Sequence, residues 1–160
     1  MVNLTAFAAA TGLLLVDYQN NVLDSSFASA VNNNPVISSP RNIPATTNQQ
    51  WNLVPSETSP GTFNFQSLLG STFLSYSNVA SGGPSRFAQA TLHSTLPANF
   101  ILQQLSDTSL VLFEVISNTT LTSWPVQPTP GLVAPPVTYE VFHGAPGQFW
   151  KTTAADGGPL

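Results

Sequence analysis

The sequence predicts an all-β domain built from three related units, and its composition provides the first two observations. Charged residues make up 6% of the 160-residue chain, against about 25% in a typical domain. Because surface helices draw their solvent-facing side chains from Glu, Lys and Arg, this scarcity disfavours helix. The 14 prolines and 10 glycines, among many Val, Phe and Thr residues, favour short strands joined by turns. The third observation is a repeat.

A large aromatic residue recurs at nearly equal spacing along the chain. Trp51, Phe100 and Trp150 are separated by 49 and 50 residues. Each lies in a predicted strand, and these strands span 48–54, 97–105 and 147–154. A period of this length is typical of folds in which one supersecondary unit cannot cover its own apolar face and is completed by its neighbours.

Three further strand-like stretches precede each aromatic residue in a constant order. The first lies at 12–17, 61–66 and 109–115, and the third at 35–38, 86–90 and 138–142. The second lies at 22–26, 72–76 and 120–124, where Leu23, Leu74 and Leu121 occupy matching positions. Four elements in one order, three times, predict a β-trefoil with repeats one, two and three at roughly 1–57, 58–107 and 108–160.

A β-trefoil closes six strands into a barrel and uses the other six as hairpins that cap one end. We therefore expect Trp51, Phe100 and Trp150 to meet in one shared core, where the burial of each contributes about 1.5–3 kcal/mol. A β-sandwich is the alternative architecture built from short strands. It gives no reason for a threefold recurrence of all four elements.

The net charge of −4 narrows the possible partners and chemistry. Only Arg41, Arg86 and Lys151 are positive, so no basic stripe can neutralise nucleic-acid phosphates or an anionic membrane surface. The absence of cysteine excludes disulfides and cysteine-based metal sites or nucleophiles. No motif indicates a catalytic centre or a metal site, and we expect His93 and His143 to serve turns. We expect neither an enzyme nor a cofactor.

Three motifs in repeat one carry a family resemblance. They are a Leu-Asp pair ending at Asp24, an Asn-rich turn at 32–35, and a Gln-Gln-Trp sequence at 49–51. These motifs resemble the repeats of the ricin B-like family, and the sequence YEVFHGAPGQFW at 139–150 is similar to the mushroom branch of that family. The resemblance implies a β-trefoil with one of two functions. The same fold serves mushroom lectins and fungal protease inhibitors such as mycocypins and cocaprins.

The first function, carbohydrate binding, is tested against the chemistry of a sugar. A sugar ring has one apolar face and a rim of hydroxyls, so a galactoside site of the ricin type needs a carboxylate, an amide and a stacking aromatic ring. The resemblance implies that Asp24 is the carboxylate and that Asn48 and Gln49 are the amides. The aromatic ring is expected at or just after the third strand, but residues 37–40 include none. The site in repeat one is therefore degenerate.

The other two repeats lack the carboxylate. Ser75 and Thr122 stand at its position in repeats two and three. In repeat three, Tyr139, Phe142 and His143 are candidate aromatic residues and Gln148 is a candidate amide. An alternative role for Asp24 is to cap its own turn by accepting backbone N–H groups. Asn48 and Gln49 have a similar alternative role, which is to close the turn before Trp51.

The second function, protease inhibition, needs loops that are held rigid and lose little entropy on docking. Pro40 and Pro44 frame Arg41 within the loop 38–48, and five prolines lie in 124–137. Proline fixes φ and so pre-organises a loop. These loops carry almost no charge, which suits desolvation in a protease cleft.

In the mycocypins, papain-like proteases are met by the loops between strands one and two and between strands three and four. The resemblance carries these contacts onto two loops of repeat one. Their residues are Tyr18, Gln19, Asn20 and Asn21 in the first loop, and Pro40, Arg41, Asn42, Ile43 and Pro44 in the second, which spans 40–47. The first loop lacks the glycine that would let the backbone pass close to a catalytic thiol. Arg41 is an alternative contact for a trypsin-like protease, and a pepsin-like target stays open.

On balance the sequence favours a non-catalytic fungal protease inhibitor, with cysteine proteases as the first target and a ricin B-like lectin as the alternative. The apolar N-terminal stretch 1–16 lacks a basic segment, so we expect it to belong to the fold rather than to a signal peptide. The protein is then expected in the cytoplasm of a fungal fruiting body, as a monomer or weak dimer.

Overall fold

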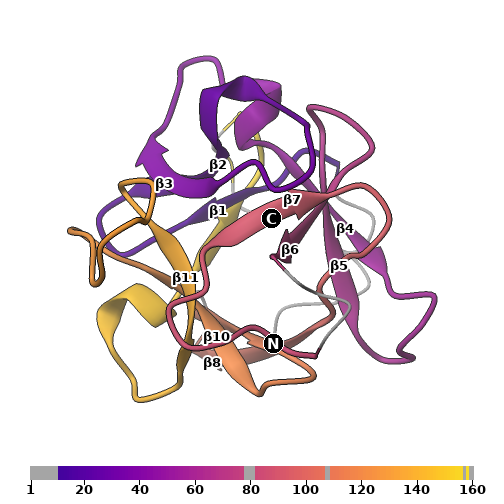
Figure 1. Cartoon of the computed structure of the whole chain (residues 1–160). Coiled ribbons are helices and arrows are strands. Elements are labelled where there is room, and N and C mark those ends of the chain that lie inside the picture. The colour runs from indigo at the N-terminus through magenta and orange to yellow at the C-terminus, as the bar shows by residue number, and fades with distance from the viewer. Residues whose placement is uncertain (1–10, 78–81, 107–108, 157, 159–160) are drawn as a thin grey trace.

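The computed structural model describes residues 11–77, 82–106, 109–156 and 158, and it confirms the all-β prediction (Figure 1). The strands are β1 (Leu14–Val16), β2 (Asn21–Ser25), β3 (Val36–Pro40), β4 (Trp51–Pro55), β5 (Phe63–Ser67), β6 (Phe73–Tyr76), β7 (Ala90–His93), β8 (Phe100–Ser106), β9 (Ser109–Glu114), β10 (Thr119–Ser123), β11 (Val137–Val141) and β12 (Lys151–Thr153). Short 3-10 turns lie at η1 (Ser26–Ala28), η2 (Thr47–Gln49) and η4 (Pro146–Gln148). The first ten residues, which were expected to belong to the fold, lie outside the described residues.

Six strands close a barrel in the order β1, β4, β5, β8, β9, β12. Antiparallel ladders join β4 to β5, β8 to β9 and β12 to β1. Single residue pairs complete the circle: Leu13 with Trp51, Phe63 with Phe100, and Leu110 with Trp150. Each of these three pairs includes one of the recurring aromatic residues. The residues that define the predicted repeat therefore also take part in closing the barrel.

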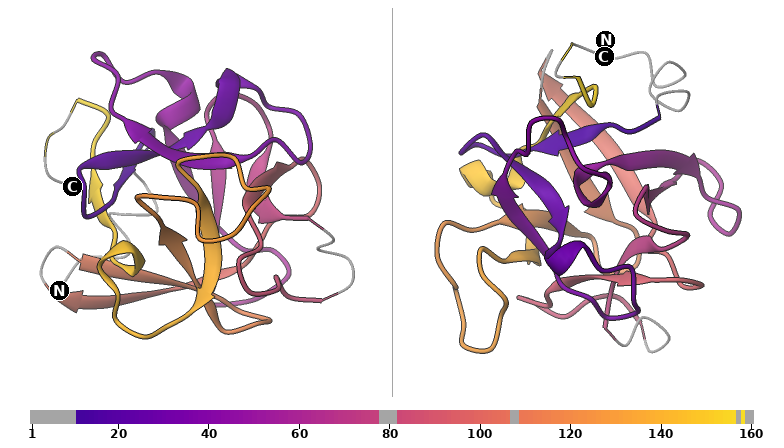
Figure 2. Two further views of the ribbon diagram at one scale, coloured as in Figure 1. Left: turned by 60° about the vertical axis from the view of Figure 1, so that its left-hand side comes forward. Right: turned by 90° about the horizontal axis from the view of Figure 1, so that it is seen from above.

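The remaining six strands form three hairpins, β2–β3, β6–β7 and β10–β11. Bridges between residues outside or at the ends of these strands connect the hairpins to one another: Pro35 with Thr91, Ile37 with Pro136, and Gln89 with Thr138. The three hairpins thus cap one end of the barrel, which is the β-trefoil architecture, and Figure 2 shows their arrangement from two further sides.

The shared core holds the three recurring aromatic residues, as predicted. Trp51, Phe100 and Trp150 are each 0% exposed and belong to one hydrophobic cluster. Trp51 Nε1 donates a hydrogen bond to the Leu23 carbonyl at 3.0 Å, and Trp150 Nε1 donates one to the equivalent Leu121 carbonyl at 2.9 Å. The indole N–H groups are therefore satisfied within the core and fix the barrel to the hairpins.

In repeat two, the buried carbonyl at the position of Leu23 obtains its hydrogen bond without an indole. Its Phe100 has no N–H group, and the carbonyl of Leu74, at the position of Leu23, instead accepts the backbone N–H of Ala98 at 3.0 Å. All three buried carbonyls at this position are thus hydrogen-bonded, by two different means.

The third strand of repeat two is not where the spacing predicts it. It spans Ala90–His93 rather than 86–90, with Leu74 opposite Leu92. Phe87 lies in a turn and has a left-handed φ of 61°, which a strand does not accommodate. The predicted range is wrong because loop lengths differ between the repeats, and equal spacing misplaces an element that follows a longer loop.

None of the helical segments in the described ranges is long and apolar enough to cross a membrane.

Candidate functional site

The strand registers identify one position that the three repeats share at the second strand. Asp24 on β2 lies opposite Ile37, Ser75 on β6 opposite Thr91, and Thr122 on β10 opposite Thr138. The matching leucines immediately precede all three positions in the sequence. A carboxylate is therefore present at this position in repeat one and replaced by a hydroxyl in the other two repeats.

Asp24 is the centre of a hydrogen-bonded group that we call the Asp24 cluster, made of Asp24, Ser39, Asn48 and Gln49. Asn48 Nδ2 donates to Asp24 Oδ1 at 2.7 Å, and Gln49 Nε2 donates to Oδ2 at 2.9 Å. The hydroxyl of Ser39, on the neighbouring strand β3, donates to Oδ2 at 2.5 Å. The structure thus brings together all three residues that the sequence predicts for a sugar site, although Asn48 and Gln49 follow Asp24 by 24 and 25 residues.

The members of the Asp24 cluster differ in exposure. Gln49 is 0% exposed and Asp24 is 7% exposed, whereas Asn48 is half-buried. Among the described residues, Asp24 Oδ1 accepts a hydrogen bond from Asn48, and this oxygen and the more exposed Asn48 amide form the polar edge of the cluster. The alternative role of a turn cap belongs to a different residue. Asp17 Oδ1 accepts the backbone N–H groups of Gln19 at 2.8 Å and Asn21 at 3.0 Å.

Gln49 also holds the loop that follows β3. Its Nε2 donates to the Pro40 carbonyl at 3.0 Å, and its Oε1 accepts the Asn42 backbone N–H at 2.8 Å. Gln49 therefore contacts Asp24 and closes the turn before Trp51, which is the alternative role considered for it.

Repeat three keeps the framework of this site without the carboxylate. Gln148 donates to the Val141 carbonyl at 2.9 Å and accepts the His143 N–H at 2.9 Å, the same pattern as Gln49. Of the aromatic residues considered there, Tyr139 is 0% exposed and cannot stack on a ligand. Phe142 is 37% exposed and packs edge-on against Phe113 and Phe149.

Sequence reasoning did not single out two residues near the Asp24 cluster. The stretch 37–40 is considered only for its lack of an aromatic ring, yet the hydroxyl of Ser39 is part of the cluster. Phe27, in the turn η1, is 85% exposed, and η1 contacts η2, which carries Asn48. The signal that could have found Phe27 is a bulky aromatic inside the run Ser-Ser-Phe-Ala-Ser, where turn-forming residues are expected.

The two loops predicted to contact a protease lie side by side. Asn21, at the end of the first loop, pairs with Pro40, at the start of the second. The first loop is a tight turn in which Asn20 adopts a left-handed φ of 64°, the conformation for which glycine is the usual residue. Tyr18 is 41% exposed in this turn, and Gln19 is also exposed.

The second loop is held by its own side chains and presents one apolar residue. Asn42 Nδ2 donates to Thr46 Oγ1 at 2.8 Å, and Gln50 Nε2 donates to the Ala45 carbonyl at 2.7 Å. Ile43 is 91% exposed at the tip. Arg41 is half-buried, and its guanidinium donates to the Ala155 carbonyl at 2.7 Å. This arrangement does not present Arg41 as the exposed basic residue that a trypsin-like protease would need.

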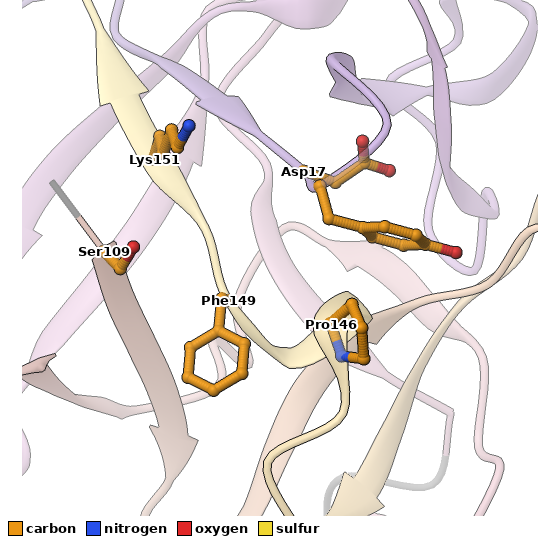
Figure 3. Close-up of a pocket in the computed structure, with 6 residues that line it drawn as sticks. Asp17, Ser109, Pro146, Phe149 and Lys151 are labelled. Carbon is orange, nitrogen blue, oxygen red and sulfur yellow. The ribbon is translucent and has the colours of Figure 1, made fainter.

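A pocket of about 330 Å³ joins the first loop to repeat three (Figure 3). Its lining residues are Asp17, Tyr18, Ser109, Pro146, Phe149 and Lys151. Partial burial and then the neighbouring Asp17 carboxylate raise the pKa of Tyr18, so its hydroxyl keeps its proton at neutral pH. Asp17 is 2% exposed and is occupied by the turn and by Ser38, whose hydroxyl donates to Asp17 Oδ2 at 2.5 Å. The other polar side chains that line the pocket are those of Tyr18, Ser109 and Lys151.

No group of three or more His, Cys, Asp or Glu residues that could hold a metal ion occurs in the described ranges. Two buried carboxylates have structural partners instead. Glu140 Oε1 accepts from Arg86 Nε at 2.9 Å, and Glu114 Oε2 accepts the Ser117 N–H at 2.8 Å.

Comparison with known proteins gives likenesses in structure alone. No protein-family model matches the chain, and no curated protein matches its sequence. The Rhizoctonia solani agglutinin superposes with a TM-score of 0.73 at 15% identity, covering 90% of this chain and 95% of that one. The Macrolepiota procera ricin B-like lectin, solved in complex with lactose, gives 0.68 at 16% identity, covering 91% and 97%.

A designed threefold-symmetric protein, ThreeFoil, gives a TM-score of 0.72 at 21% identity and covers 88% of this chain and 96% of its own. Its threefold symmetry matches the arrangement of barrel pairs and hairpins described above. At such identities a likeness in structure shows the fold alone. The chain is a β-trefoil, similar in fold to the ricin B-like lectins of fungi.

Proposed function

We propose that this protein binds carbohydrate through the Asp24 cluster, with a terminal β-galactoside, as in lactose, as the first candidate ligand. The observation that carries the proposal is the convergence of Asp24 and Asn48 on one polar edge. The Macrolepiota procera lectin, whose fold is similar, was solved with lactose bound. This order reverses the preference drawn from the sequence, since the structural likenesses include lectins and the Asp24 cluster is assembled.

The chemistry of the cluster suits a sugar hydroxyl. The hydroxyl would donate to Asp24 Oδ1, which accepts from Asn48, and would itself accept from the second hydrogen of Asn48 Nδ2. Ser39 and Gln49 hold the carboxylate from the other side, so it is oriented before the ligand arrives. A charged acceptor that is largely buried and already oriented forms a stronger hydrogen bond than an exposed one.

The decisive experiment titrates lactose into the purified protein and follows binding by NMR chemical shifts, with a glycan array beside it. Asn48→Ala removes the amide that would donate to the sugar hydroxyl and should weaken binding about 2- to 13-fold, because a hydrogen bond between neutral groups contributes about 0.5–1.5 kcal/mol. Asp24→Asn removes the negative charge and replaces one carboxylate oxygen, which accepts hydrogen bonds, by an NH2 group, which donates them. This variant should not bind lactose.

The matched control is Thr47→Ala, an exposed neighbour of Asn48 on the same turn η2. It should leave lactose binding unchanged. If the wild-type protein binds no glycan on the array, or if Asn48→Ala and Thr47→Ala bind equally well, the proposal fails.

A second candidate function is inhibition of a papain-like protease by the loop 40–47. The observation that favours it is Ile43, 91% exposed at the tip of a loop held by the side chains of Asn42, Gln49 and Gln50. A loop that is already ordered loses little entropy on docking, and an uncharged tip is easily desolvated. The first loop, with Tyr18, would lie beside it in the same cleft.

Hydrolysis of a fluorogenic peptide by papain tests this second function, with pepsin and trypsin assayed in parallel. Sub-micromolar inhibition of papain that is lost in Ile43→Asp supports it. Val126→Asp, at an apolar residue 69% exposed in a different loop, is the control that should not change inhibition. Absence of inhibition in all three assays would leave carbohydrate binding as the single proposed function.

A further inference from the structure

Phe27 stands out because it combines high exposure with an unfavourable backbone. Its side chain is 85% exposed, so it gains almost nothing from burial. Its backbone has φ 58° and ψ 17°, and the next residue, Ala28, has φ 47°. A bulky side chain is unfavourable in the left-handed region, where its Cβ atom crowds the backbone. Such strain persists only where the surroundings impose it, and it concentrates at functional sites.

The turn that carries Phe27 is held from outside by Asn34, which is 7% exposed. Asn34 Nδ2 donates to the Ser26 carbonyl at 2.8 Å and lies 2.9 Å from the Ser29 carbonyl. The Ser25 hydroxyl also donates to the Ser29 carbonyl, at 2.7 Å. These bonds fix the backbone on both sides of Phe27 without using its side chain. The phenyl ring is therefore presented to solvent by a rigid turn.

This turn lies next to the Asp24 cluster. It directly follows β2, which carries Asp24, and η1 contacts η2, which carries Asn48 and Gln49. Figure 1 shows both turns at the same end of the molecule, beside the β2–β3 hairpin. The strand β3, where a stacking aromatic was expected, offers none.

We propose that Phe27 is the apolar platform of the carbohydrate site, stacking on the apolar face of the sugar while Asp24 and Asn48 meet its hydroxyls. This inference rests on the proposed function of the Asp24 cluster. It explains why repeat one can bind a sugar without an aromatic on β3. It also explains why an exposed phenylalanine occupies a position where glycine would be less strained.

The test uses two substitutions that separate binding from stability. Phe27→Gly removes the ring and relieves the left-handed backbone, so the urea concentration at the midpoint of unfolding should stay equal or rise. Phe27→Ala removes the ring but keeps a Cβ atom, so stability should not rise. Both variants should bind lactose about 3- to 10-fold more weakly in NMR titrations, since stacking contributes about 0.5–1.5 kcal/mol. Phe27→Trp should bind as well as the wild type or better.

Ile116→Ala, at an apolar residue 62% exposed in repeat three, is the control and should bind lactose normally. Normal lactose binding by Phe27→Gly, while Asn48→Ala binds weakly, would overturn this inference and leave the proposed function standing. A clear fall in the unfolding free energy of Phe27→Gly would also overturn it, because the ring would then have a structural role. If the wild type and Phe27→Trp both fail to bind lactose, the proposed function fails first.

Discussion

Gln49 and Gln148 form matching pairs of hydrogen bonds at equivalent positions of repeats one and three. Each donates to a carbonyl at the end of the third strand and accepts a backbone N–H two residues further on. Both side chains are 0% exposed. The glutamine two residues before the tryptophan thus holds the loop between the third and fourth strands. Of these two glutamines, Gln49 also contacts a carboxylate, that of Asp24.

The first prediction follows from this pair. Gln49→Ala and Gln148→Ala should each lower the free energy of unfolding by about 1–3 kcal/mol, because each removes a buried side chain that makes several hydrogen bonds. Only Gln49→Ala should also weaken lactose binding. Urea denaturation and NMR titration of the two variants measure both effects. Equal binding by the two variants would show that Gln49 does not orient Asp24 for a ligand.

The second prediction concerns the indole hydrogen bonds of the core. Trp51→Phe removes the donor to the Leu23 carbonyl and part of the core volume, so it should cost about 2–4 kcal/mol. Phe100→Leu in repeat two breaks no such bond, because the Leu74 carbonyl is satisfied by the Ala98 backbone. It should cost less than Trp51→Phe. Chemical denaturation of both variants measures the difference, and the reverse order would contradict the assigned role of the indole.

The third prediction concerns pH. Burial, and then the charge of the nearby Glu114 carboxylate, raises the pKa of Tyr76 to about 12 and that of Tyr139 well above 10. The folded state therefore keeps these protons while the unfolded state loses them above its ordinary pKa near 10. The stability from these tyrosines should be fully present below pH 10 and fall as the pH rises from 10 toward 12.

Urea denaturation between pH 8 and 11 should show this decline, which can reach about 1.4 kcal/mol per pH unit for each tyrosine. The chain has three tyrosines. Absorbance at the phenolate wavelength should therefore report Tyr18 ionising in the folded protein and the other two only on unfolding. Three phenolates in a still-folded protein would contradict the burial of Tyr76 and Tyr139.

The fourth prediction concerns the ion pair between Arg86 and Glu140. The Glu140 side chain is 2% exposed, whereas that of Arg86 is 69% exposed and its guanidinium lies 4.7 Å from the Phe87 ring centre. Arg86→Met should destabilise the protein by about 1–3 kcal/mol, because it leaves a buried carboxylate without its cation. Adding Glu140→Gln should recover part of the loss, as a double-mutant cycle can measure. Independent, additive effects would show that the two side chains are not coupled.

The fold could be predicted from the sequence because large buried residues recur at regular spacing. Trp51, Phe100 and Trp150 occupy one structural position three times, and the spacing between them records it. The third strand of repeat two was misplaced because turns tolerate changes in length, and the left-handed Phe87 has no signature in a count of residues.

The polar part of the candidate site was also predictable, but its surroundings were not. Asp24, Asn48 and Gln49 lie in the motifs that resemble the ricin B-like repeats, and the fold brings them together. Phe27 could not be predicted in this way, because it is distinguished by its exposure and its left-handed backbone, and the spacing of residues indicates neither. The environment of Arg41 escapes for a different reason, since its partner, the Ala155 carbonyl, lies 114 residues away in the sequence.

Only repeat one has a carboxylate, Asp24, at the position that Ser75 and Thr122 occupy in the other two repeats. This difference bears on whether the protein could cross-link cells. A lectin cross-links cells only if it offers at least two binding positions at once, and the second engagement gains from a high effective concentration. If the proposed site at Asp24 is the carbohydrate site, a single copy of this chain would coat a glycan-covered surface without agglutinating it. Clumping of red blood cells would then require self-association, and joining two copies through a flexible linker should be enough to create it.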